Sequence, residues 1–289
     1  MKRENAMKRN VTIAAAIVLV AAARASAAAP FAMVTDLKGE AWSMEGTEPR
    51  KLGMLAYIEK PTHIRVDPAA KVVVTYFANG LQYSIAGPAR VSVETPTPNM
   101  IEGQMGESRK ITPDKSIGGG LSPEQWRRLQ QATVVMRAVR SKFSVVGPDK
   151  TVVLTQEPEF EWTTLPNAKG YRLVVYTVHN SVIHESTTEH NIVRPGAALA
   201  LKAGASYRWK VDALGVSKPV STFGSFEVAD SAVREQMLTL KATAGSDAAA
   251  RAFYATTLEA NGHMHDARVE WRALARDYPD QTEFRQRAR

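Results

Sequence analysis

The chain has 289 residues, of which 44% are hydrophobic and 23% charged, a composition typical of globular protein and sufficient for two or three domains. Its net charge is +8, but residues 1–27 hold five basic residues and one acidic residue, so the remainder carries only +4. This mild excess, without basic blocks interleaved with aromatics, argues against nucleic-acid binding. The absence of cysteine excludes disulfides, thiolate metal sites and lipid attachment through cysteine.

The N-terminus has the pattern of a secretory signal peptide over residues 1–27. Two Lys and two Arg precede an apolar core at residues 11–23, which is too short to span a bilayer comfortably. Ala25 and Ala27 fit the small-x-small rule for cleavage. We therefore expect a mature chain of residues 28–289 in the periplasm or beyond, with an uncleaved anchor as the alternative. No later stretch approaches 18 apolar residues, so no membrane span is expected in the mature chain.

Residues 71–93 show the clearest strand pattern in the chain. Large apolar side chains occupy every second position in two successive runs, which indicates strands with one buried face. Asn79 and Gly80 lie between the runs and predict a hairpin, because both residue types tolerate positive φ. A third run follows a Gly-Pro turn, so this stretch predicts a β-meander.

Residues 31–94 resemble FecR-like domains in their order of strands and glycines. The resemblance rests on Val34, Leu37, Gly39 and Ala41, then on residues 52–58, 64–66, 71–74, 79–85 and 89–93. It implies a small periplasmic β domain that takes part in signalling or protein contacts rather than catalysis. Sigma-factor control is not implied, because the chain lacks the N-terminal anti-sigma helices of the transmembrane regulators.

Residues 95–121 are predicted to be a linker, with a Thr-Pro repeat at one end and three glycines at the other. A helix is predicted over residues 122–142, opened by a capping box between Ser122 and Gln125. Trp126 begins an apolar stripe at helical spacing. This pattern fits a connector helix packed on a neighbouring domain, and the alternative is a helix that binds a partner or a membrane surface.

A second β domain is predicted over residues 143–228, where several short strands are separated by turn signals. The predicted strands are residues 151–154, 160–162, 171–177, 181–185, 207–213 and 223–228. The domain resembles fibronectin type III and related immunoglobulin-like sandwiches at residues 159–162, 168–173 and 201–213. The resemblance implies a β-sandwich, for which the expected core aromatics are Trp162, Tyr171, Tyr207 and Trp209. It implies no particular ligand, since this fold hosts many functions.

The C-terminal segment, residues 229–289, has helical periodicity and predicts helices broken at Gly262 and Pro279. Asp247 and Asp266 are predicted N-caps. The spacing of small and bulky residues resembles a single tetratricopeptide unit, and the residues that would form a partner-binding surface are Leu258, Gly262, Ala267 and Trp271. A lone unit cannot bury its apolar face, so a neighbouring domain or a partner must cover it. An interaction surface and a capping hairpin both remain open.

Two histidine groups are the candidate metal ligands, and neither has the spacing of a closed site. His179, His184 and His190 lie near Glu185 and Glu189, and His263 and His265 flank Met264 in a predicted turn. No motif for a catalytic nucleophile, a nucleotide or a zinc protease is present in the sequence.

The sequence therefore predicts a mainly β multi-domain protein: a FecR-like β domain, a linker helix, a fibronectin type III-like sandwich and a C-terminal helical hairpin. We expect no enzyme and no cofactor, but an exported scaffold that binds envelope proteins. The alternative is a periplasmic sensory or regulatory module that binds a small ligand or cell-wall glycan and signals to a membrane partner. Exposed aromatics over a groove would favour glycan contact, and Trp42 and Tyr57 are the candidates.

Overall fold

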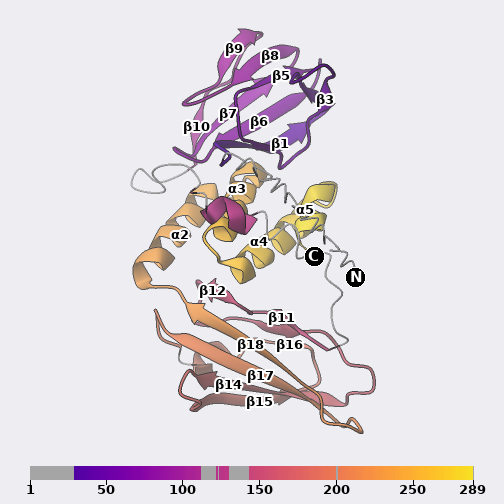
Figure 1. Ribbon diagram of the computed structural model, residues 1–289, viewed down its shortest axis with the longest axis vertical. Helices are drawn as coiled ribbons and strands as arrows, with labels where there is room; N and C mark the ends of the chain where they lie inside the picture. The colour runs from indigo at the N-terminus through magenta and orange to yellow at the C-terminus, as the bar shows by residue number, and fades with distance from the viewer. Residues whose placement is uncertain (1–28, 112–121, 123, 130–142, 200, 289) are drawn as a thin grey trace, which may run out of the picture.

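The computed structural model describes residues 29–111, 122, 124–129, 143–199 and 201–288. In Figure 1 a β-sandwich lies at each end of the molecule, and helices from the C-terminal part of the chain lie between them. The predicted mainly β multi-domain class is confirmed. The predicted signal peptide, with Ala25 and Ala27, lies outside the described residues. Within the described part of the chain, no helix has the length and apolar character needed to cross a membrane.

The first sandwich consists of two antiparallel five-stranded sheets, ordered β10-β7-β6-β1-β4 and β3-β2-β5-β8-β9. The alternating apolar residues face inward and form one core with Val34, Val74 and Ile85 among its buried members. The strands are β1 (Ala32–Lys38), β2 (Ala41–Ser43), β3 (Arg50–Lys51), β4 (Tyr57–Ile58), β5 (Thr62–Val66), β6 (Lys71–Tyr76), β7 (Leu81–Ala86), β8 (Ala89–Val93), β9 (Asn99–Glu102) and β10 (Arg109–Lys110).

The first sandwich extends beyond the predicted boundary at residue 94. Residues 95–111, assigned from the sequence to the linker, supply β9, which pairs with β8, and β10, which pairs with β7. Ile111 is fully buried in the core between this sandwich and the helices. The Thr-Pro repeat indicated an extended chain, and the extended chain returns to both sheet edges instead of leaving the domain. Residues 112–121 of the predicted linker lie outside the described residues.

The predicted hairpin joins β6 to β7, but the turn spans residues 77–80 rather than two residues. Gly80 takes a positive φ of 62°, which L side chains rarely adopt. Asn79 plays a different role from the expected one, because its side-chain Oδ1 accepts a hydrogen bond from the Leu81 amide at 2.9 Å.

Residues 124–129 are helical, and the predicted capping box forms in both directions. The Ser122 amide donates to Gln125 Oε1 at 2.8 Å, and the Gln125 amide donates to Ser122 Oγ at 3.2 Å. Trp126 and Leu129 are buried against Ala260 of the C-terminal helices. This part of the predicted linker helix therefore packs on a neighbouring unit, while residues 130–142 lie outside the described residues.

The second sandwich has a three-stranded sheet, β11-β13-β16, and a five-stranded sheet, β12-β18-β17-β14-β15. All of its strand pairs are antiparallel except β12 with β18. The strands are β11 (Val145–Gly147), β12 (Thr151–Val153), β13 (Phe160–Trp162), β14 (Gly170–Thr177), β15 (Val182–Thr188), β16 (Ile192–Val193), β17 (Ser206–Leu214) and β18 (Ser221–Val228), with a 3-10 turn η1 at Gly196–Leu199. This is the two-sheet architecture that the fibronectin type III resemblance implies.

All four expected core aromatics lie between the two sheets of the second sandwich, each at most 5% exposed. The polar atoms of three of them are bonded to the backbone. Tyr171 Oη accepts from the Leu165 amide, and Tyr207 Oη accepts from the Lys202 amide. Trp209 donates its indole Nε1–H to the Pro148 carbonyl at 2.7 Å. These bonds fix the loops that connect the sheets as well as the core itself.

The C-terminal segment forms α2 (Ser231–Ala244), α3 (Ala248–Ala260), α4 (Met264–Asp277) and α5 (Thr282–Arg287). Asp247 caps α3, since its carboxylate accepts from the Ala250 amide at 2.8 Å. The cap predicted at Asp266 is wrong, because α4 starts earlier and His263 is its N-cap residue. The Asp266 carboxylate instead accepts from the Leu154 amide of the second sandwich. Helix α5 was not predicted.

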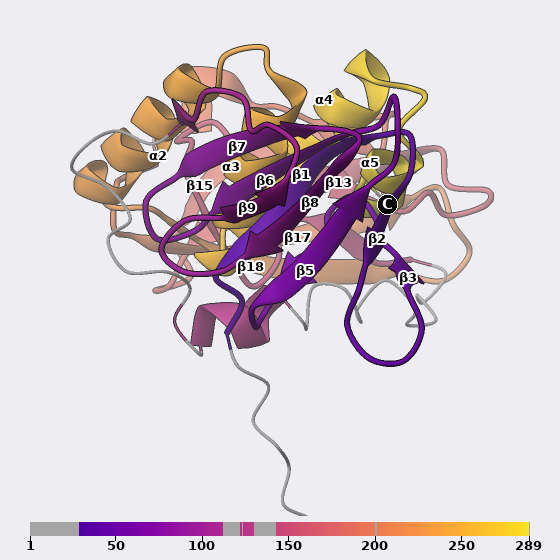
Figure 2. The ribbon, with the colours of Figure 1, turned by 90° about the horizontal axis from the view of Figure 1, so that it is seen from above.

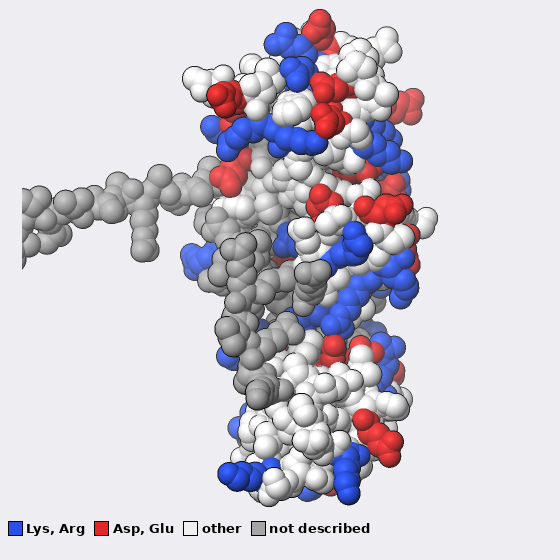
Figure 3. All heavy atoms as spheres, turned by 90° about the vertical axis from the view of Figure 1, so that its right-hand side faces the viewer, with Lys and Arg blue, Asp and Glu red and all other residues white. Residues whose placement is uncertain are grey.

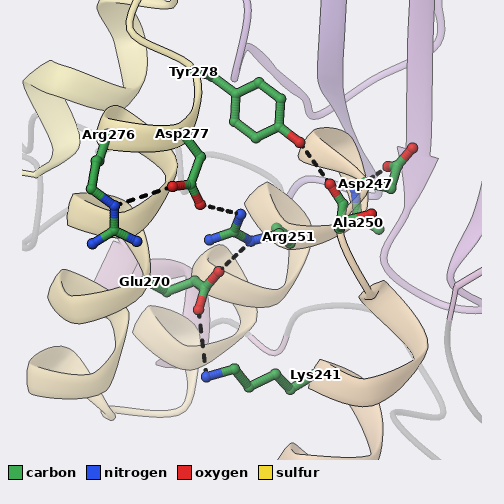
Figure 4. Close-up of polar contacts among 9 residues, drawn as sticks. Lys241, Asp247, Ala250, Arg251, Glu270, Arg276, Asp277 and Tyr278 are labelled. Carbon is green, nitrogen blue, oxygen red and sulfur yellow. Dashed lines mark hydrogen bonds and ion pairs between the residues drawn. The ribbon is translucent and has the colours of Figure 1, made fainter.

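A polar network ties α2, α3 and α4 together (Figure 4). Arg251 of α3 contacts Glu270 at 2.7 Å and Asp277 at 2.8 Å, and Lys241 of α2 lies 3.7 Å from Glu270. Burial lowers the pKa of Arg251, but its bonds to the two carboxylates outweigh burial, and the net pKa is raised. Glu270 is buried, so the arginine supplies the counter-charge that its carboxylate needs.

These helices pack against both sandwiches, which accounts for their apolar faces. Seen from above, the first sandwich lies over the helices (Figure 2). One buried cluster takes Met33 and Phe77 from the first sandwich, Leu154 from the second, and Phe253 and Trp271 from the helices. The rings of Phe77 and Phe253 stack at 5.7 Å between centroids. We call α2 to α5 the helical unit.

Candidate functional site

Three of the four residues predicted to bind a partner through the helices are buried, and the fourth, Gly262, is partly buried against the second sandwich. Leu258, Ala267 and Trp271 are at most 1% exposed, and Gly262 accepts a hydrogen bond from the Val152 amide of the second sandwich. The expectation of an accessible surface at these residues is therefore corrected. The apolar face that a lone helical pair cannot bury is covered by the two sandwiches of the same chain.

A buried ion pair closes the helical unit against the first sandwich. The Glu259 carboxylate accepts the indole hydrogen of Trp271 at 2.9 Å and lies 3.2 Å from the Arg287 guanidinium. Arg287 donates to Tyr57 Oη at 3.0 Å and stacks over the Trp271 ring. Burial raises the pKa of Tyr57 to about 12 and also raises the pKa of Glu259, although Arg287 opposes both changes. Tyr57 thus lies in the contact between the first sandwich and the helical unit, and its ring is not available to stack on a sugar.

Trp42, the other glycan candidate, has both its polar atom and one ring face engaged. Its indole Nε1–H donates to Asp67 at 2.9 Å, and the Arg65 guanidinium lies 5.7 Å from the ring centroid. Arg65 is in turn paired with Asp67 at 3.2 Å. The arrangement stabilises the loop between β5 and β6 and places a guanidinium over one face of the Trp42 ring.

The first histidine group is spread along the β14–β15 hairpin. His184 bonds Ser186 at 3.1 Å, whereas Glu185 pairs with Arg172 at 2.7 Å across the sheet. His179 and His190 are exposed. Among the described residues, no three His, Asp or Glu side chains converge on a common point where a metal ion would be held.

The second histidine group does not lie in a solvated turn, contrary to the expectation. His263 is 2% and His265 is 7% exposed, and both contact the second sandwich. The ring nitrogen Nδ1 of His263 lies 3.0 Å from the Val152 carbonyl, and the His265 amide donates to Thr151 Oγ1 at 3.4 Å. Burial lowers the pKa of both imidazoles. The sequence offered no signal for this placement, because the contacted strand lies 111 residues earlier in the chain.

The accessible surface that best fits a binding site is the outer face of the five-stranded sheet in the second sandwich. On β14, β17 and β18 the residues that alternate with the core point away from it. Phe223 is 65% exposed, the highest value among the large apolar residues of the described chain. Val178 and Val182 at the β14–β15 hairpin are more than half exposed. We call Arg172, Tyr176, Val178, Val182, Arg208, Lys210, Asp212 and Phe223 the outer face.

Ion pairs hold two cations of the outer face in place, since Arg172 pairs with Glu185 and Lys210 with Asp212. Lys210 Nζ lies 5.9 Å from the Phe223 ring centroid and 2.7 Å from Asp212. Burial favours a higher pKa for Asp212, but hydrogen bonds from Lys210 and Ser221 and the charges of Lys210 and Arg172 lower it overall. The outer face thus presents the exposed ring of Phe223 with Arg172 and Arg208, and aromatic residues and arginine are enriched in protein interfaces.

A cleft of about 1220 Å³ adjoins the outer face where β17 and β18 approach the helical unit. Its lining includes Arg208 and Ser225 from the sheet, Asn261 and Met264 from the helical unit, and Arg128. Residues 130–142, which follow the short helix that contains Arg128, lie outside the described residues. Across the face shown in Figure 3, acidic and basic side chains are mixed.

No protein-family model matches the chain, and no curated protein matches it. Among solved structures, a segment of two fibronectin type III domains from chicken tenascin is 10% identical, covering 68% of this chain and 83% of its own, with a TM-score of 0.21. The FN1–FN3 domains of chicken CNTN1 are 10% identical, covering 68% of this chain and 54% of their own, with a TM-score of 0.18. A β-1,2-glucanase from Parabacteroides distasonis is 11% identical, covering 74% and 39%, with a TM-score of 0.16. Similarities this low carry no argument about function.

Proposed function

We propose that this protein is an exported, non-enzymatic scaffold of the bacterial envelope that binds another protein through the outer face of its second sandwich. The observation that carries the proposal is the exposure of Phe223 on the outer face. This side chain is 65% exposed beside ordered cations, whereas most large apolar side chains of the described residues are buried. Export is supported by the signal-peptide pattern in residues 1–27. The FecR-like resemblance of residues 31–94 supports a role in protein contacts.

The position of the helical unit between the two sandwiches supports a scaffold role. It contacts both sandwiches through one buried core, which joins them into a single body rather than two domains on a flexible tether. A partner held at the second sandwich would therefore stand at a fixed position relative to the first. The alternative, a sensory module for a small ligand or glycan, gains no support from Trp42 or Tyr57, because both side chains are engaged within the protein.

The test is capture of partners from envelope extract by the mature chain, residues 28–289, compared with two single variants. Phe223→Ser removes the exposed ring of the outer face, and Ile101→Ser removes a 52% exposed apolar residue of the first sandwich as a matched control. We expect Phe223→Ser to lose the partner and Ile101→Ser to retain it. Unchanged capture by Phe223→Ser, or binding of wall glycan alone, would overturn the proposal.

Point variants are better suited to this test than truncation at Val228. Removing the helical unit would expose the buried side chains of Met33, Phe77 and Leu154, which pack against it. An exposed apolar patch of this kind binds proteins without specificity, so capture by the truncated chain would not report on the outer face.

A further inference from the structure

The second sandwich meets the helical unit along a short strip of backbone. Val152 of β12 donates its amide to the Gly262 carbonyl at 3.2 Å, and Thr151 Oγ1 donates to the same carbonyl at 3.0 Å. Just beyond β12, the Leu154 amide donates to the Asp266 carboxylate at 3.0 Å. These bonds link residues more than 100 positions apart, so they exist only while the two units are docked.

His263 lies within this strip as a neutral imidazole. Its Nδ1 faces the Val152 carbonyl at 3.0 Å, and a carbonyl oxygen only accepts, so Nδ1 carries the hydrogen. The side chain is 2% exposed, which leaves little solvent to stabilise a charge on the ring. The charged neighbour of the ring is Arg128, from the short helix at residues 124–129. A second positive charge at His263 would thus be both poorly solvated and repelled.

His265 is the second imidazole of the strip and packs directly on the backbone of the second sandwich. A Cβ at Gly147 would lie 2.7 Å from Nδ1 of His265. The charged groups around the ring are Arg268, Arg272, Arg194 and Glu161. Glu161 accepts two bonds from Arg272, at 2.6 and 3.1 Å, so its charge is already compensated. Arg272 and Glu161 largely offset each other and Arg194 pairs with Glu159 at 3.3 Å, so the largest charge effect on the His265 ring comes from Arg268.

We propose that this contact is an acid-sensitive joint, in which protonation of His263 and His265 releases the second sandwich from the helical unit. The sandwich would then swing about Asp230, the exposed residue through which β18 runs directly into α2. We expect the contact between the helical unit and the first sandwich to stay closed in acid, because its stacked rings of Phe77 and Phe253 do not titrate and burial already raises the pKa of Glu259 in its ion pair with Arg287. The proposal does not depend on the proposed function.

The direction of the effect follows from the two imidazoles. Burial, with a smaller contribution from Arg268, lowers the pKa of His265 to about 4 from an ordinary value of about 6.5, and burial also lowers the pKa of His263. Between those values the released state holds more protons than the docked state. Docking is therefore fully stabilised above about pH 6.5 and weakens as the pH falls. For His265 alone, the docking equilibrium changes on the order of a hundredfold.

Asp266 opposes this effect. Burial raises the pKa of Asp266 to about 6, although hydrogen bonds from the backbone and the charge of Lys241 oppose the rise. Tyr254 is a further titratable group that interacts with this carboxylate. The docked state takes up a proton at Asp266 between about pH 6 and 4, so acid favours docking there. The effect of protonating Asp266 on docking thus offsets the effect of protonating one of the two imidazoles. Replacing Asp266 by Asn, whose amide oxygen still accepts from Leu154, should make release more sensitive to acid.

The separation of the two units can be measured directly, because the chain contains no cysteine. Lys218→Cys in an exposed loop of the second sandwich and Ser246→Cys in the helical unit take two spin labels or fluorophores. In the mature chain we expect one short label distance at about pH 7.5 and a longer, broader distribution at about pH 4.5, reversible on neutralisation and without loss of far-UV circular dichroism. With Asp266→Asn the change should begin at higher pH.

The matched variants decide the assignment. His263→Asn, which keeps a donor for Val152, combined with His265→Gln should abolish the change, and the exposed control His190→Gln should leave it intact. In the wild type, hydrogen exchange at the Val152 and Leu154 amides should accelerate in acid relative to β17, after correction for intrinsic rates. The proposal is overturned by an unchanged distance in wild type and Asp266→Asn, by the same response in the double variant, or by separation only with loss of secondary structure.

Discussion

Removing the guanidinium of Arg287 should destabilise the joint between α5 and the first sandwich. The side chains of Arg287 and Glu259 are 11% and 6% exposed and lie 3.2 Å apart, and Arg287 also bonds Tyr57. Arg287→Met keeps the aliphatic stem but leaves Glu259 as an isolated buried carboxylate. Breaking a buried ion pair in this way costs about 3–5 kcal/mol.

The size of this loss should depend on pH, through Glu259. Burial already raises the pKa of Glu259 while Arg287 opposes the rise, so the pKa must rise further in Arg287→Met. A carboxyl whose folded pKa is raised binds an extra proton in the folded state. The variant is therefore closest to wild type below about pH 4.5 and loses stability as the pH increases through the raised pKa.

The assay is urea unfolding of the mature chain followed by circular dichroism at about pH 5 and about pH 8. The double variant Glu259→Gln/Arg287→Met removes both charges and should recover most of the loss at the higher pH. Arg285→Met, at an exposed position of the same helix, is the control and should change stability little. An equal loss at both pH values, or a double variant no more stable than the single one, would refute the reasoning.

Three further substitutions test the fold. Trp209→Phe leaves the Pro148 carbonyl without its indole donor and should cost about 1–3 kcal/mol in urea unfolding, whereas retained stability would show that the bond is dispensable. Asp247→Ala removes the N-cap bond to Ala250 and should cost about 1 kcal/mol, with Asp247→Ser recovering most of it; equal losses for the two would contradict the cap. Gly262→Ala forces a side chain onto a φ of 83° and should lower the melting temperature, and no change there would argue against strain at this turn.

Strands with a long alternating pattern were predictable from the sequence. The apolar residues of β7 and β17 repeat every second position, because one face of each strand is buried against a core, and the pattern also shows in β6 and β14 although residues on both of their faces are buried. β10, β11 and β16 have only two or three residues, too few for a period to appear, and they were missed, whereas the equally short β12 and β13 were predicted from the turn signals around them. The six-residue helix α5 was missed for the same reason.

The candidate site was less accessible to sequence reasoning, because a pattern shows that a face is apolar but not what covers it. The spacing of Leu258 and Trp271 is the same in a helix that binds a partner and in a helix buried within the protein. Only the tertiary structure shows that these two residues are buried. In β18 the residues around Phe223 alternate between buried and exposed positions, and Phe223 lies on the exposed, polar face opposite Lys210. The placement of His265 depends on a sandwich that folds from distant residues.

The position of the helical unit also has a consequence for how the protein is made. Thr256 of α3 contacts Met33 of β1, 223 residues earlier, so the core shared by the two sandwiches is completed by residues that are synthesised after both of them. Until the helical unit folds, the side chains of Met33, Phe77 and Leu154 in the two sandwiches stay exposed to solvent. A chain that stops before the helical unit would leave these surfaces exposed to aggregation.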